Sequence, residues 1–191
     1  MPGPRPLGLD FAAMALPAQT SQPSPANVEG SAHSTDSSLR EQALGHIFLG
    51  QLLAFMWRQR ARDIEVLKSE VDRGGYDLVL ESNRVIRHVQ LKSSFRGSKV
   101  REVDVSIKLL SKLGGCILWL EFDEQSLAID RFYWFGGPPG MPLPELGNRI
   151  SRHSKGDSHG KKNERLGHRV LAKRDFQMLA DIGEVVGKLF G

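Results

Sequence analysis

Cysteine and long apolar runs are almost absent from this chain of 191 residues. Its one cysteine, Cys116, excludes a disulfide bond within the chain and is typical of a reducing cytoplasm. No stretch approaches the roughly 20 apolar residues that a membrane-spanning helix needs. The apolar residues near the start are interrupted by Asp10 and accompanied by one basic residue, Arg5, which is unlike a signal peptide. We therefore expect a cytoplasmic protein with no membrane association.

Residues 1–37 lack apolar periodicity and hold most of the ten prolines together with many serines. Such a composition cannot bury enough apolar surface to offset the entropy of folding, so we expect a disordered N-terminal tail. The remaining residues, 38–191, are enough for one domain with a core of its own.

Aromatic residues are missing from the segment 148–174, which is the most basic part of a chain with a net charge of +4. Within the segment only Asp157 and Glu164 oppose nine lysines and arginines. This composition suits contact with the phosphate backbone of DNA. Without aromatic side chains, the segment shows no sign of stacking on bases. The expected contact residues are Arg149, Arg152, Lys155, Lys161, Lys162 and Arg165. A solvated basic loop is the alternative.

The glycines near Lys161 do not have the order of a phosphate-binding loop, so we expect no nucleotide cofactor. A homodimer is possible on the sequence alone.

Two neighbouring strands, 76–81 and 85–92, carry the most informative pattern in the chain. Side chains alternate between the two faces of a strand, and a two-residue turn at 83–84 sets Asp77 directly opposite Gln90, with Lys92 next along the same face. A longer loop would shift this pairing by one residue while keeping the alternation. A carboxylate, an amide oxygen and an ammonium group then converge, as a metal-assisted phosphodiesterase requires. The other face is apolar and comprises Tyr76, Leu78, Leu80, Val89 and Leu91.

A helix is predicted over 38–60, where apolar residues recur every three or four positions and Glu41 lies at the edge of the apolar stripe. Glu41 could point across to the hairpin. The further predicted elements are a strand over 63–71, a helix over 103–113, a buried strand over 116–122, a strand over 127–134 and a last helix that Asp175 caps. Together they predict an α/β domain with a mixed sheet.

The order of elements is a helix with Glu41, a strand, a strand that opens with Gly74-Gly75-Tyr76-Asp77 and the strand with Gln90-Leu91-Lys92, and it resembles the core of the PD-(D/E)xK nucleases. The Gln-x-Lys form is similar to that of the Mrr-like branch, and the run through Ser93-Ser94 is similar to certain bacterial domains of the superfamily. The resemblance covers about residues 38–135. It implies a restriction-endonuclease-like fold, in which helices flank a mixed β-sheet.

The resemblance also implies roles for the four polar residues. Asp77, Gln90 and Glu41 would hold Mg²⁺ or Mn²⁺, and Lys92 would orient the attacking water or stabilise charge on the scissile phosphate. The implied activity is a metal-dependent endonuclease that hydrolyses phosphodiester bonds in DNA. Because Gln90 stands where many members have glutamate, the alternative is an inactive module on the same fold that binds nucleic acid or a protein partner. A further alternative is that these residues form no site: Gln90 and Lys92 lie on a solvated sheet face, and Glu41 is an ordinary exposed charge on a helix.

Overall fold

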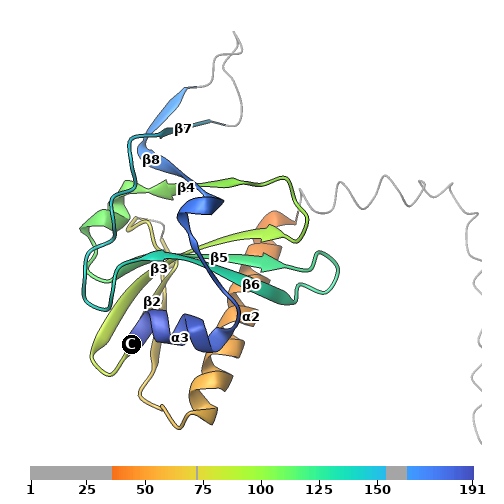
Figure 1. Cartoon of the computed structure of the whole chain (residues 1–191), viewed down its shortest axis with the longest axis vertical. Helices are drawn as coiled ribbons and strands as arrows, with labels where there is room; N and C mark the ends of the chain where they lie inside the picture. Colours follow the sequence, from red (N-terminus) through yellow and green to blue (C-terminus); the bar gives the residue numbers. More distant parts are fainter. Residues whose placement is uncertain (1–35, 72, 154–162) are drawn as a thin grey trace, which may run out of the picture. The chain divides into compact units, whose positions relative to one another are not determined.

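A computed structural model of the chain describes residues 36–71, 73–153 and 163–191. One compact unit spans Ser38–Gly191, and its architecture is described here (Figure 1). The predicted tail, apart from its last two residues, lies outside the described residues, as do Lys155, Lys161 and Lys162. Neither described helix is long and apolar enough to cross a membrane.

A mixed sheet of six strands forms the middle of this unit, which confirms the predicted α/β class. β3 and β5 are parallel, and the other neighbouring pairs are antiparallel. In spatial order the strands are β1 (Glu65–Lys68), β2 (Leu78–Ser82), β3 (Val85–Phe95), β5 (Gly115–Phe122), β6 (Ile129–Gly136) and β9 (Gln177–Leu179). The strand predicted over 63–71 is therefore shortened to the four residues of β1.

A second sheet of three antiparallel strands lies beside the first. Its order is β4 (Glu102–Ser106), β8 (Glu164–Ala172) and β7 (Ile150–Arg152). Side chains of β4 and β8 share a core with one face of the large sheet, including Trp119 of β5.

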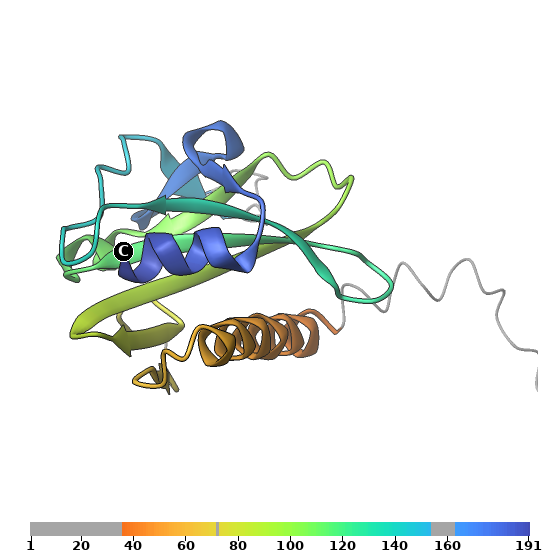
Figure 2. The same cartoon turned by 60° about the horizontal axis from the view of Figure 1, so that its bottom comes forward.

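Two helices cover the opposite face of the large sheet, as Figure 2 shows for α2 (Ser37–Arg58) and α3 (Ile182–Phe190). α2 forms where the sequence predicts it, and it buries every fourth residue against the sheet: Leu44, Phe48, Leu52 and Met56. Leu78, Leu80 and Val89 of the hairpin belong to the same core, so the apolar hairpin face is the one that α2 covers.

The hairpin has the predicted register, with Ser82 paired to Val85 across the two-residue turn. Asn83 and Arg84 both have positive φ, at 50° and 64°, as the tightest hairpin turns require. Asp63 stabilises this turn by accepting hydrogen bonds from the Asn83 backbone N–H and the Ser82 hydroxyl. These bonds, the Asn83 bond foremost, lower the pKa of Asp63 below its usual value.

The helix predicted over 103–113 is wrong. Residues 102–106 form β4, and only Ile107–Ser111 turn into a short 3-10 helix. Val103 and Val105 are β-branched and pair with Leu171 and Arg169 of β8, and these ladder bonds outweigh the weak helical spacing.

The last helix starts later than predicted. Residues 177–179 after Asp175 form the edge strand β9, paired with β6. α3 begins at Ile182, and its N-cap is Asp181, whose side chain accepts a hydrogen bond from Glu184 N–H.

Candidate functional site

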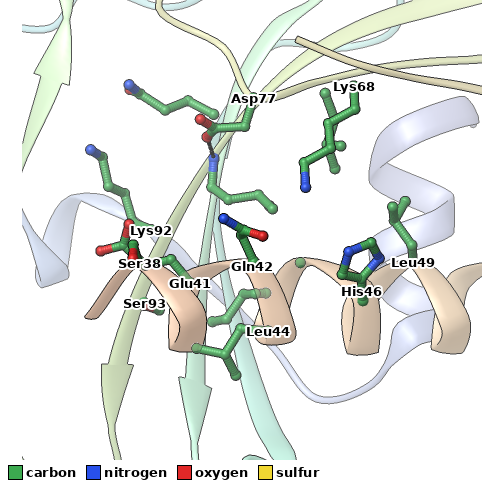
Figure 3. Close-up of a pocket in the computed structure, with 15 residues that line it drawn as sticks. Ser38, Glu41, Gln42, Leu44, His46, Leu49, Lys68, Asp77, Lys92 and Ser93 are labelled. Carbon is green, nitrogen blue, oxygen red and sulfur yellow. Dashed lines mark hydrogen bonds between the residues drawn. The ribbon is translucent and has the colours of Figure 1, made fainter. Parts of the chain in front are cut away.

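A cavity of about 450 Å³ lies between α2 and the end of the β2–β3 hairpin (Figure 3). The four residues that the sequence singles out all line it: Glu41, Asp77, Gln90 and Lys92. They come from three separate elements, so the fold rather than the chain order brings them together.

Asp77 precedes β2 directly and extends its pairing with β3. Its backbone N–H donates to the Val89 carbonyl at 2.9 Å, and its carboxylate oxygen Oδ2 accepts from the Leu91 backbone N–H at 2.6 Å. The side chain is exposed to solvent although one oxygen is held by the backbone. Asp77 is therefore positioned by β3 and still accessible from the cavity.

Gln90 lies opposite Asp77 in this register, and only 8% of it is exposed. Its side-chain oxygen Oε1 is fully buried and has no hydrogen-bond partner among the described residues. A buried amide oxygen without a partner costs about 1–3 kcal/mol, so most such atoms in proteins are satisfied. This one lies where a bound cation or a water molecule could satisfy it.

Lys92 and Glu41 approach the cavity from different sides of the sheet. Lys92 is half-buried and shares the Gln90 face of β3, next to Trp119 of β5. Glu41 is exposed on α2, which covers the other face. A helix therefore does not cover the polar hairpin face. The residues meet around the open edge beyond the start of β2, where Figure 3 shows Asp77 and Lys92 above the α2 ribbon that carries Glu41.

The donor atoms at this cavity fit a hard divalent cation. Two carboxylates and an unpartnered amide oxygen are the oxygen ligands that Mg²⁺ and Mn²⁺ prefer. Within residues 36–71, 73–153 and 163–191 there is no cluster of three or more His, Cys, Asp or Glu side chains suited to a metal. With glutamine at position 90, the candidate metal centre has two carboxylates, those of Glu41 and Asp77.

Two described arginines of the basic segment are paired with acids that lie outside the segment. Arg149 contacts Glu102 at 2.7 Å, and Arg165 contacts Asp104 at 3.1 Å. Both acids belong to β4, and Asp104 lies within the helix predicted over 103–113. Arg152 contacts Glu164 at 3.6 Å. Within the segment only Asp157 and Glu164 are acidic, but β4 pairs with β8 and brings two further carboxylates against these arginines.

Sequence reasoning missed two basic residues of the cavity, Lys68 of β1 and His46 of α2. The helical spacing gave little signal for His46, since it lies one turn after Gln42 but five residues after Glu41. The sequence offered no signal for Lys68, because its position at the cavity depends on the pairing of β1 with β2.

No protein-family model matches this chain, and no curated protein matches it. Among solved structures it is similar to a bacterial homing endonuclease, I-Ssp6803I, with a TM-score of 0.32 and 21% sequence identity. The similarity covers 65% of this chain and 85% of that chain. These values are too low to assign a family, so the resemblance to the PD-(D/E)xK nucleases stays a prediction from the sequence.

Proposed function

We propose that this protein is a metal-dependent nuclease that hydrolyses phosphodiester bonds in DNA. One observation carries the proposal: Glu41, Asp77, Gln90 and Lys92 line a single cavity, and the buried side-chain oxygen of Gln90 has no hydrogen-bond partner among the described residues. A site that combines oxygen donors with a half-buried cation suits a reaction in which negative charge develops on a phosphate.

In this proposal Asp77, Gln90 and Glu41 hold the cation, and Mg²⁺ or Mn²⁺ supplies Lewis-acid stabilisation of the phosphate oxygens when bound. The Leu91 N–H keeps the Asp77 carboxylate in a fixed orientation. Lys92 donates hydrogen bonds to the phosphate and stabilises its charge, and the partial burial of Lys92 strengthens that interaction. The basic segment, with Arg149, Arg152, Lys155, Lys161, Lys162 and Arg165, would contact the DNA backbone.

The test is cleavage of plasmid and oligonucleotide DNA by the purified full chain with Mg²⁺ or Mn²⁺. Asp77→Asn and Lys92→Ala should each lower the cleavage rate by about a hundredfold or more, the size of effect seen when one transition-state contact is lost. Glu145→Gln is the matched control, since it removes one exposed carboxylate outside the cavity. Equal rates in all four proteins would assign the cleavage to a contaminant and reject the site.

A second candidate function is a DNA-binding module without cleavage, which is favoured because the described residues contain no cluster of three or more His, Cys, Asp or Glu side chains suited to a metal. It predicts DNA retention that is sensitive to salt and indifferent to a chelator. The nuclease instead predicts measurable binding of Mn²⁺ by calorimetry, and this binding should weaken in Asp77→Asn.

A further inference from the structure

The cavity is larger than one cation site requires. An ion with six waters of about 30 Å³ each fills roughly 180 Å³, which is less than half of the available 450 Å³. Its lining runs along α2 from Ser38 to Leu49, a rise of about 16 Å. Neighbouring phosphates of one DNA strand advance about 3.4 Å along the helix axis, so the cavity has room for a second phosphate.

The part of the cavity away from Lys92 contains a second cation, Lys68. β1 pairs with β2 so that Lys68 lies beside Leu78, and the next residue, Ser69, donates its N–H to the Asp77 carbonyl at 3.0 Å. Lys68 is therefore one strand away from the proposed centre. Figure 3 shows Lys68 and Lys92 on opposite sides of Asp77.

The ammonium group of Lys68 is available to a ligand. Lys68 is exposed, and within the described part of the chain no carboxylate lies at ion-pair distance from it. A lysine at the wall of a cavity without a partner acid is suited to an anion.

Two side chains of α2 face the same space. Gln42 and His46 are exposed, lie one helical turn apart and line the cavity with Lys68. In Figure 3 the Lys68 amine extends from β1 toward the α2 ribbon, where both residues are attached. Together they offer an ammonium, an amide and an imidazole, all of which can donate to phosphate oxygens.

We infer that Lys68, with Gln42 and His46, binds the DNA phosphate that neighbours the scissile one, on the side of Asp77 away from Lys92. This inference rests on the proposed function, because it assigns a second phosphate of the same strand to the same cavity. Lys68 would position the strand and take no part in the bond cleavage itself.

The first arm of the test measures binding. Duplex oligonucleotide affinity of the full chain is followed by fluorescence anisotropy in EDTA, where cleavage cannot occur, at several salt concentrations. Lys68→Gln should weaken the affinity for DNA by about tenfold. It should also reduce the magnitude of the negative slope of log K against log salt by about one. Lys108→Gln, the same charge change on an exposed residue outside the cavity, should leave the slope unchanged.

The second arm locates the phosphate. A neutral methylphosphonate is placed at each position around the cleaved bond, and affinity is measured for wild type and Lys68→Gln. One neighbouring position should weaken the wild type by about tenfold and leave Lys68→Gln within twofold, since the contact is already lost. In Mg²⁺, Lys68→Gln should raise KM and keep kcat within about twofold.

The outcomes separate the two proposals. If the wild type cleaves DNA but Lys68→Gln matches Lys108→Gln in affinity, slope and methylphosphonate response, the second phosphate site is rejected and the nuclease stands. If the wild type binds without cleaving and Lys68→Gln lowers the slope, the nuclease is rejected and the phosphate contact stands. Absence of any DNA binding rejects both.

Discussion

Arg87 makes the sharpest stability prediction, because it is a fully buried guanidinium on the strand that carries Gln90 and Lys92. Its Nε and Nη2 atoms donate to the Leu189 and Lys188 carbonyls, both at 2.7 Å, which satisfies carbonyls at the C-terminal end of α3. Its Nη1 atom donates to the carbonyls of Gly137 and Pro138 at 3.1 and 3.2 Å. Burial lowers the pKa of Arg87 from its usual value.

Arg87→Met keeps an unbranched apolar stem, ends before the guanidinium and removes every one of these bonds. Hydrogen bonds to a charged group contribute about 1.5–3 kcal/mol each, and the two short bonds alone account for about 3–6 kcal/mol. The variant also avoids the desolvation of a guanidinium, which costs several kcal/mol. We therefore expect a net loss of about 2–4 kcal/mol in the free energy of unfolding.

The assay is urea unfolding followed by tryptophan fluorescence. With a slope of about 2 kcal/mol per molar urea, the midpoint of Arg87→Met should fall by about 1–2 M. The urea midpoint of Arg87→Lys should lie between those of wild type and Arg87→Met, because a lysine keeps the charge but lacks the planar set of guanidinium donors.

The control is Arg131→Met, since Arg131 is 57% exposed and lies 3.8 Å from Glu121. Arg131 is mostly exposed and Glu121 keeps its ion pair with Lys173 in the variant, so the loss should be less than about 1 kcal/mol and the midpoint of Arg131→Met should stay within about 0.5 M of wild type. Equal midpoints for Arg87→Met and Arg131→Met would refute the reasoning.

Three further predictions concern the site, the backbone and pH. Gln90→Glu adds a carboxylate at the cavity and should raise Mn²⁺ affinity by about tenfold in calorimetry; unchanged affinity would remove Gln90 from the metal site. Gly114→Ala should lower the urea midpoint by at least 0.5 M, about 1 kcal/mol, because Gly114 has φ of +67° and a Cβ there collides with the Ile86 carbonyl oxygen. Hydrogen bonds, first from Ser126 N–H, lower the pKa of Asp123 to about 2 from 3.8. Its folded pKa is the lower one, so the Asp123 contribution is present above pH 4 and is lost as pH falls toward 2; Asp123→Asn should flatten the fall in Tm over that window.

The hairpin was predictable because its information is local. Alternation fixes which residues share a face, and a two-residue turn fixes which residues oppose each other. Asp77, Gln90 and Lys92 all lie in this hairpin, so the local pattern was enough to place them relative to one another. The structure also shows what the hairpin pattern left open, since α2 covers the Leu78 face and not the face of the polar residues.

The wrong predictions depend on partners that are distant in the sequence. The short segment that begins at Val103 fits a helical spacing and a strand alternation equally well. The pairing of Val103 with Leu171 of β8 makes the segment a strand. Asp175 and Asp181 are both good helix caps, and the pairing of β9 with β6 leaves Asp181 to begin α3. Lys68 joins the cavity only through the register of β1, which the amino-acid pattern does not determine.

The cavity exists because the two strands of the hairpin differ in length. β2 has 5 residues and β3 has 11, so β3 runs on beyond Asp77 with β5 on one side and open space on the other. Gly75 explains why β2 begins no earlier: its φ of +73° turns the chain, and a Cβ there would collide with the Ser106 side chain. The Asp77 carboxylate accepts a hydrogen bond from the Leu91 N–H at the edge of this opening. The cavity that Gln90 and Lys92 line therefore lies beside the part of β3 that β2 leaves unpaired.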